Sequence, residues 1–320
     1  MTSLTRRTFG LAALSAPAIL TATTLPAMAD GHAHAKGAPA LFDVPIGNYR
    51  MTALFDGMGP LQKGMFFSDD QASIDQALAA GGITGDAMPA PITAFLLQSA
   101  DRTILIDAGF GDLDMFGPGF GRVFSGLNAL GVAPEDVDMI IVTHAHPDHI
   151  GGMMAGGAAA FPNAEVAITQ AELDFWGDAG IMAQAPEDAQ GLFQLAQTVY
   201  GAYGDRLIPV EGGTEIAPGI TLEMSPGHTP GHALVHIDGG ARELLMVADT
   251  LHSAVLHTAL PDVGFGFDTD AGLAAASRRS VFDRASADNL LIAGTHLPFP
   301  GVGHFVRSGE AYAYVAASVM

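Results

Sequence analysis

The sequence predicts an α/β fold in a single large domain, from three observations. Short apolar runs bounded by turn residues recur along the chain, which is typical of strands. Segments with a helical pattern lie between these runs. Residues of the types that bind metal follow several runs, between positions 144 and 296. One site therefore draws on most of the chain, which favours one domain with an ample core.

Individual elements follow from local patterns. A helix at 122–130 is expected to end at Gly131, and the residues 99–102 read as the turn of a hairpin. Further helices are expected at 170–176, 186–203 and 271–285. The expected strands are 49–55, 92–97, 103–106, 139–142, 164–169, 220–224, 233–237 and 243–247.

The segment from Thr143 to His149 carries the most specific chemistry. It places three imidazoles and one carboxylate directly after the apolar run 139–142. Neutral imidazoles and carboxylates are ligands for zinc and related metals. A loop leaving a strand can direct His144 and His146 to one ion, and Asp148 and His149 to another. The alternative, a histidine-rich surface turn, is disfavoured because further ligand-type residues recur downstream.

Three single residues complete this pattern. His228 lies in the Gly/Pro turn 225–232, whereas Asp249 and His296 each follow an apolar run. The order His-x-His-x-Asp-His, then a lone His, Asp and His, resembles the metallo-β-lactamase superfamily from about Tyr49 to His304. The resemblance implies an αββα sandwich with two zinc ions. Its implied ligands are His144, His146 and His228 for one ion, Asp148, His149 and His296 for the other, and Asp249 as a bridge.

The N-terminus resembles a twin-arginine export signal in residues 1–29. Arg6 and Arg7 precede an apolar stretch, and Ala27-Met28-Ala29 offers a small-x-small cleavage site. That stretch is short and interrupted by Pro17, which disfavours a membrane span, although an uncleaved anchor is the alternative. We therefore expect a periplasmic or secreted protein, with a flexible arm at 30–40 and the hydrolase domain at 41–320.

The composition limits the classes of binding partner that are expected for this protein. The formal net charge is −21, and such a surface repels phosphate backbones, so nucleic acid is not an expected partner. Beyond the N-terminal segment no stretch approaches membrane-span length without charge, so a membrane is not expected as a partner either. The chain has no cysteine, so thiolate ligands are excluded, which argues against the antibiotic-hydrolysing relatives that usually place a cysteine on the second metal. A small-molecule ester or lactone is the expected substrate, and a homodimer is left open.

The resemblance implies hydrolysis by a hydroxide that bridges two zinc ions, other divalent metals remaining open. Catalytic roles are expected for Asp249, Asp148 and His252. The last lies three residues after Asp249, where acyl-homoserine-lactone hydrolases of similar pattern carry tyrosine. Asp107, at a strand end, is the candidate acceptor for a ligating imidazole.

Within the superfamily, the segments 115–118, 174–176, 225–232 and 296–304 most resemble methyl-parathion-hydrolase-like enzymes and their aryl-ester and lactone-hydrolysing relatives. No convincing general acid is found, which favours good leaving groups. The preferred substrates are therefore aryl esters or aryl lactones, with organophosphate triesters as a side activity. The residues expected to line the substrate pocket are Phe116, Trp176, Phe267 and Phe299.

Three other interpretations stay open. The first is an N-acyl-homoserine lactonase that degrades quorum signals. The second is a sulfur-processing member that uses one iron. The third, a periplasmic metal-binding protein without catalysis, is disfavoured because its ligands would close the coordination sphere.

Overall fold

The computed structural model describes residues 38–115, 117 and 119–317. The export signal, most of the arm and the pocket candidate Phe116 lie outside the described residues. No helix within the described part is both long and apolar enough to cross a membrane.

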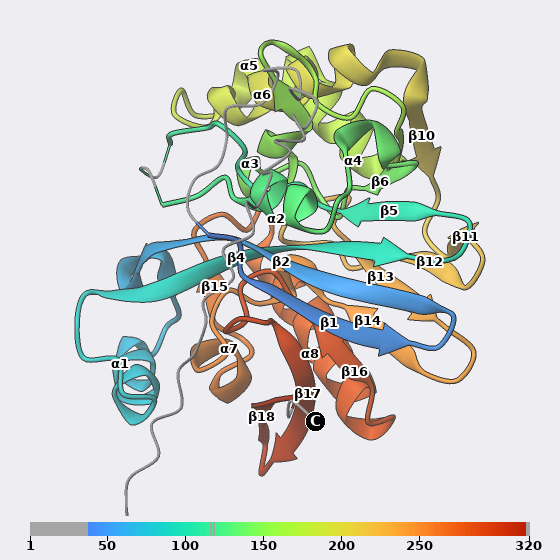
Figure 1. The fold of residues 1–320 in the computed structure, drawn as a ribbon. Coiled ribbons are helices and arrows are strands. Elements are labelled where there is room, and N and C mark those ends of the chain that lie inside the picture. Colours follow the sequence, from blue (N-terminus) through green and yellow to red (C-terminus); the bar gives the residue numbers. More distant parts are fainter. Residues whose placement is uncertain (1–37, 116, 118, 318–320) are drawn as a thin grey trace, which may run out of the picture. The chain divides into compact units, whose positions relative to one another are not determined.

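Two seven-stranded sheets dominate the fold (Figure 1). The first sheet is antiparallel from β1 to β5 and parallel from β5 to β10. Its spatial order is β1 (Leu41–Ile46), β2 (Tyr49–Gln62), β4 (Ala87–Gln98), β5 (Thr103–Ile106), β6 (Met139–Ile141), β9 (Glu165–Thr169) and β10 (Leu207–Val210).

The second sheet is antiparallel except where β14 pairs with β16. Its order is β11 (Thr214–Ala217), β12 (Ile220–Met224), β13 (Ala233–Asp238), β14 (Glu243–Met246), β16 (Leu291–Ala293), β17 (Val302–Ser308) and β18 (Ala311–Ala316). Two short ladders join β3 (Phe66–Phe67) to β15 (Gly264–Phe265) and β7 (Met154–Ala155) to β8 (Ala158–Ala159).

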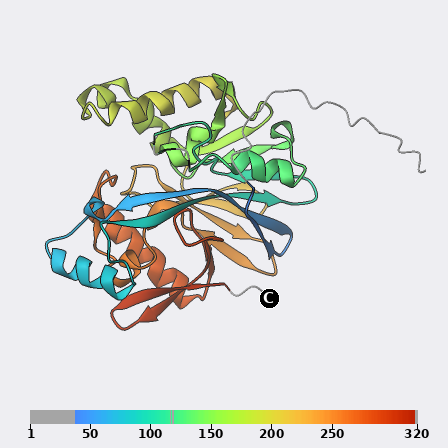
Figure 2. The ribbon, with the colours of Figure 1, turned by 60° about the vertical axis from the view of Figure 1, so that its left-hand side comes forward.

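Helices cover both outer faces of the paired sheets, as Figures 1 and 2 show with the green and yellow helices on one side and α8 on the other. This arrangement confirms the expected αββα sandwich. The helices are α1 (Gln71–Ala80), α2 (Val123–Ala129), α3 (Pro147–Ile150), α4 (Gln170–Gly177), α5 (Ala179–Gln184), α6 (Gln190–Tyr203), α7 (Leu256–Ala259) and α8 (Ala271–Ala287).

Alternating side chains on the strands build three apolar layers. Leu97 of β4 packs between the sheets with Val235 of β13, whereas its neighbour Leu96 faces the helices on the other side. A third layer joins the second sheet to α8, for example through Phe282. Because successive strand residues point to opposite faces, each central strand contributes to two layers.

Strand direction gathers the ligand-type residues at one edge. β5, β6 and β9 are parallel, so the segments after them start from the same edge of the first sheet. In the second sheet β12 is antiparallel to β13, and β13 to β14, so β12, β14 and β16 all run the same way. The segments containing His228, Asp249 and His296 follow these three strands. The ligand-type residues predicted to follow strand ends therefore lie close together.

Candidate metal centre

The loop after β6 is held in place by Asp107. The Asp107 carboxylate accepts hydrogen bonds from the backbone N–H of Thr143 at 2.9 Å and from its hydroxyl at 2.8 Å. It also accepts one from His149 Nδ1 at 2.7 Å. Asp107 adopts a left-handed backbone with φ of 57°, which turns the chain sharply at the end of β5. The predicted role of Asp107 as an imidazole partner agrees with this geometry.

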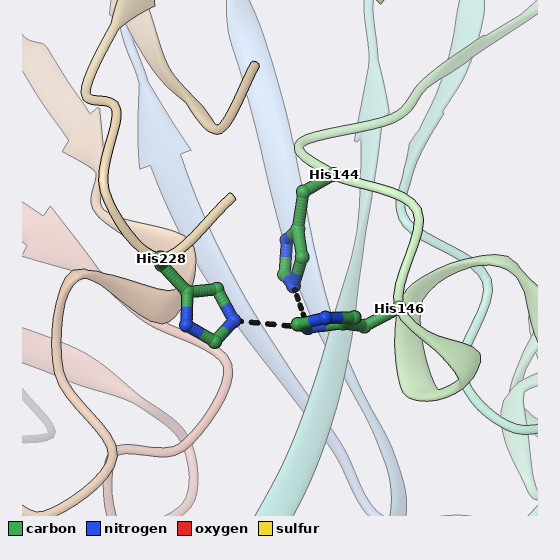
Figure 3. Close-up of side chains that lie close together, drawn as sticks. All are labelled: His144, His146 and His228. Atoms are coloured by element: carbon green, nitrogen blue, oxygen red, sulfur yellow. Dashed lines mark hydrogen bonds between the residues drawn. The ribbon is translucent and has the colours of Figure 1, made fainter. Parts of the chain in front are cut away.

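Three ring nitrogens converge in the first group of ligand-type residues (Figure 3). Nδ1 of His146 lies 3.1 Å from Nε2 of His144 and 3.0 Å from Nε2 of His228. Zinc bonded to two imidazoles at about 2.0–2.1 Å in a tetrahedral site separates their nitrogens by about 3.3 Å. The observed spacing is therefore close to that of a three-histidine metal site.

A second group forms beside the first from Asp148, His149, Asp249 and His296. Nε2 of His149 lies 3.5 Å from Oδ2 of Asp148 and 3.1 Å from Oδ1 of Asp249. Nε2 of His296 lies 3.4 Å from Asp148 and 3.0 Å from Asp249. Asp249 also approaches the first group, since its Oδ2 is 3.6 Å from His144 and 3.5 Å from His228. Its carboxylate thus lies between the two groups.

Hydrogen bonds on the far side of four rings determine which nitrogen faces the centre. His228 Nδ1 donates to Asp268 and His149 Nδ1 to Asp107, while His296 Nδ1 donates to the carbonyl of Pro91. His144 Nδ1 likewise lies 3.2 Å from the Thr143 hydroxyl. With the proton on Nδ1, each Nε2 presents a lone pair to its neighbours.

Two buried atoms in this centre have no hydrogen-bond partner, namely Nε2 of His149 and Oδ1 of Asp249. Converging lone pairs and unpaired buried acceptors repel one another unless a cation lies among them. The residues present therefore fit two divalent metal ions, with Asp249 positioned to contact both.

Electrostatics support the same conclusion. Burial holds the pKa of His144 and His228 well below the ordinary value, and lowers that of His146 to about 4. Burial also opposes charging of His149 and His296, but the nearby carboxylates, Asp249 foremost, outweigh it and raise both pKa values. A field that favours positive charge in a buried site also favours a metal cation.

Several supporting residues were not predicted. Asp268 accepts from His228 and lies 4.0 Å from the buried Arg278, which itself donates to three backbone carbonyls. Burial raises the pKa of Asp268 to about 6. The buried Glu172 bonds to both ligand loops. In the sequence, Thr169-x-x-Glu172 is a helix-capping pattern, and nothing marks Asp268 as special.

His232 serves as a structural residue. Its Nδ1 donates to the carbonyl of Ser225 at 2.9 Å, and its Nε2 accepts from the backbone N–H of Asp249 at 3.1 Å. His236 lies away from the centre in ion-pair contact with Glu223 and Glu243.

A cavity of about 170 Å³ reaches the centre from the surface. Phe267 lines it, together with Phe265, Phe110 and Phe120. The expectation that Trp176 and Phe299 line the pocket is wrong for the described cavity. Its lining residues are Gly59, Pro60, Leu61, Ala90, Ile92, Phe110, Phe120, His146, Pro147, Asp148, Leu192, His228, Asp249, His252, Phe265, Phe267 and His296.

Packing explains both corrections. Trp176 is 3% exposed and donates its indole N–H to Glu172, and its ring contacts those of His146 and Phe193. Trp176 therefore packs against the ligand loop as a buried side chain, through His146. Phe299 packs against the layer between the sheets and meets Phe55 edge-on at 5.4 Å.

His252 lies at the base of the cavity. Its Nε2 is 3.1 Å from Oδ2 of Asp249, and its ring stacks on Phe265 with the centroids 3.8 Å apart. Nδ1 of His252 is buried without a hydrogen-bond partner. Burial lowers the pKa of His252 to about 4, so the ring is neutral near pH 7.

Comparisons with known proteins agree with this centre. Residues 87–296 match the family model of the metallo-beta-lactamase superfamily. An N-acyl homoserine lactonase of Bacillus cereus is 27% identical over 228 residues, which cover 65% of this chain and 81% of the relative.

Two solved structures resemble most of the chain. The hydrolase AbOPH of the beta-lactamase superfamily is 29% identical with a TM-score of 0.82, covering 89% of this chain and 99% of its own. AidC, a dizinc quorum-quenching lactonase, is 26% identical with a TM-score of 0.80, and the match covers 88% of this chain and 99% of AidC.

Proposed function

Because this chain belongs to the metallo-beta-lactamase superfamily and is a metal-dependent hydrolase, we propose that it is a two-metal lactonase that opens N-acyl homoserine lactones. The observation that carries the proposal is the pair of adjacent ligand groups, joined by Asp249, at the base of an apolar cavity. The relatives named as N-acyl homoserine lactonases support the substrate class.

We propose zinc as the metal, supported by the His and Asp donors and by the dizinc relative AidC. The ligands are His144, His146 and His228 in one group, Asp148, His149 and His296 in the other, and Asp249 between them. Two such ions, when bound, polarise an ester carbonyl and activate water near neutral pH.

The chain's own residues supply orientation and exclusion of water. Asp107 and Asp268 hold the protons of His149 and His228 on Nδ1 and so direct each Nε2 to the centre. Apolar side chains such as Ile92 and Leu192 line the cavity above, where burial of an acyl chain is favourable. We assign His252 to substrate contact at the base of that cavity.

The sequence patterns ranked aryl esters and aryl lactones above N-acyl homoserine lactones, and the relatives favour the reverse order. One observation keeps an aryl lactone as the second candidate. Phe110, Phe265 and Phe267 line the small cavity, and aromatic walls bind planar rings well. Organophosphate hydrolysis is retained only as a side activity of that candidate.

A substrate panel tests the proposal. It contains an N-acyl homoserine lactone, dihydrocoumarin, a phenyl ester and a phosphotriester, measured as kcat/KM with zinc-loaded protein. We expect the homoserine lactone to be preferred. A preference of tenfold or more for dihydrocoumarin, about 1.4 kcal/mol in transition-state binding, would establish the aryl lactonase instead.

We also propose export by the twin-arginine route, on the basis of Arg6 and Arg7 in the sequence. Replacing both by lysine should retain precursor in the cytoplasm. Unchanged delivery of mature protein that starts at Asp30 would exclude this route.

A further inference from the structure

A single buried carboxylate, that of Glu172, joins the two loops that carry the three-histidine group. Its Oε1 accepts hydrogen bonds from the backbone N–H of Ala145 at 2.8 Å and from Nε1 of Trp176 at 2.7 Å. Its Oε2 accepts from the hydroxyl of Thr229 at 2.7 Å and from the backbone N–H of Gly231 at 3.0 Å. The side chain is fully buried.

Two of these partners, Ala145 and Thr229, are sequence neighbours of metal-ligand residues, and each belongs to a loop from a different sheet. Ala145 stands between His144 and His146 in the loop after β6, which belongs to the first sheet. Thr229 follows His228 in the loop between β12 and β13, which belong to the second sheet. One carboxylate therefore bridges the two loops, which are also joined by the hydrogen bond from the backbone N–H of Ala233 to the carbonyl of Thr143 at 3.0 Å.

The backbone around Glu172 leaves little freedom for that spacing to change. A Cβ added at Gly231 would lie 2.2 Å from the backbone nitrogen of Glu172, so the loop rests directly on the start of α4. The Thr169 hydroxyl donates to the carbonyl of Gly231 at 2.7 Å and also caps α4 by accepting from Glu172 N–H. The first turn of α4 and the loop at Gly231 are thus joined directly by hydrogen bonds and packing.

In all four contacts Glu172 is the acceptor, so both of its side-chain oxygens must be able to accept hydrogen bonds. Ala145, Trp176, Thr229 and Gly231 all supply a donor, and each oxygen receives two of them. Glutamine has nearly the same shape, but whichever way its amide is turned, its NH2 group would face at least one N–H donor from which it cannot accept. A buried donor left without an acceptor is destabilising.

We propose that Glu172 is a positioning residue that holds His144, His146 and His228 at the spacing a metal ion requires. This inference rests on the proposed two-metal centre. Replacing a residue that supports metal ligands typically lowers metal affinity about 10–100-fold. We therefore expect Glu172→Gln to weaken binding at the three-histidine group by that factor, and to leave the group of Asp148, His149 and His296 near its original affinity.

Metal retention during dialysis against increasing chelator tests the proposal. Wild type should release its two zinc equivalents at similar chelator concentrations, whereas Glu172→Gln should release one equivalent at an about 10–100-fold lower concentration. Trp176 is the single tryptophan of the chain and bonds to Glu172, so its fluorescence reports the same step. Its emission should change with the first equivalent released from the variant.

Asp56→Asn is the matched control. Asp56 is also a fully buried carboxylate that accepts from the backbone N–H groups of Phe110 and Val123, and neither of these two bonds reaches a ligand loop. This variant should melt at a lower temperature than wild type and release metal at wild-type chelator concentrations. Equal metal loss in the two variants would overturn the proposal, because general destabilisation would then explain both.

Retention of both equivalents by Glu172→Gln at wild-type chelator concentrations would also overturn it, while the two-metal centre would stand. A wild-type protein that binds fewer than two ions would overturn the centre and this inference together. If Glu172→Gln does not fold, Thr229→Val removes one of the four donors and should give a smaller shift at the same group. No shift in that variant would refute the positioning role.

Discussion

At the scale of single residues, the Asp249 carboxylate is the point where both ligand groups meet. It is 3% exposed, and burial alone would raise its pKa, but the surrounding imidazoles hold the pKa well below the ordinary value. The imidazole nitrogens within 3.0–3.6 Å of its oxygens belong to His144, His149, His228, His252 and His296.

Replacing Asp249 should therefore remove activity without unfolding the protein. We expect Asp249→Ala to lower kcat/KM by more than about 100-fold, since even residues that only support ligands are worth about 10–100-fold. His236→Ala is the control, because the His236 side chain lies away from the centre in ion-pair contact with Glu223 and Glu243, and this variant should stay within about twofold. Comparable losses in two folded variants would show that the ligand assignment is wrong.

Replacing His252 tests whether this residue binds metal or only lines the pocket. The two ligand groups are complete without it, so His252→Leu should keep two metal equivalents. The loss of its stacking on Phe265 should widen the pocket and shift the kcat/KM ratio toward the phosphotriester. Metal analysis and the substrate panel measure both effects. A drop to one equivalent would instead make His252 a ligand, as its closeness to His228 and Asp249 allows.

Some residues of the centre could be predicted from the sequence, whereas others could not. The ligand-type residues follow strand-like runs in the order typical of the metallo-β-lactamase superfamily, so the resemblance predicted their convergence. Glu172 and Asp268 could not, because each acts on residues more than 25 positions away and carries only a local capping or loop signal. The pocket predictions for Trp176 and Phe299 failed because an aromatic side chain fits a core as well as a cavity, and only packing decides.

At the scale of elements, the turn before His228 has a strict steric requirement. Gly227 has φ of 126°, and an added Cβ would lie 2.1 Å from the backbone nitrogen of Ala274 in α8. Gly227→Ala should therefore displace His228, destabilise the protein by more than about 1 kcal/mol and release metal. Thermal unfolding and metal content measure these effects.

Gly201→Ala is its control in the last turn of α6, where an added Cβ meets nothing within 4 Å. It should stabilise the protein by about 0.4–1 kcal/mol, because alanine loses less backbone entropy on folding than glycine. A Gly227→Ala protein as stable as wild type, with both metals bound, would contradict the proposed tight packing of the loop against α8.

Two elements were predicted with nearly correct limits: the strand at 164–169, observed as β9 (Glu165–Thr169), and the helix at 122–130, observed as α2. β2 continues to Gln62, beyond the expected 55, because a register shift between Phe55 and Gly57 breaks the alternating pattern. The hairpin of β17 and β18 was missed, since its exposed Val306 and Val315 weaken the alternation that marks a strand.

At the scale of the whole molecule, metal should stabilise the fold because the ligand residues come from both sheets. An ion present at about 100 times its dissociation constant stabilises the folded state by about 2.7 kcal/mol. We expect removal of metal by chelation to lower the Tm by at least about 5 °C, and added zinc to restore it. Calorimetry of the same sample before and after chelation checks this. An unchanged Tm would mean that folding and metal binding are independent.

The most direct test of the two-metal centre is anomalous X-ray scattering at the zinc edge from crystals of the zinc-loaded protein. We predict two peaks in each chain, one among His144, His146 and His228 and one among Asp148, His149 and His296, with the Asp249 carboxylate between them. A single peak, or peaks away from these residues, would contradict the account.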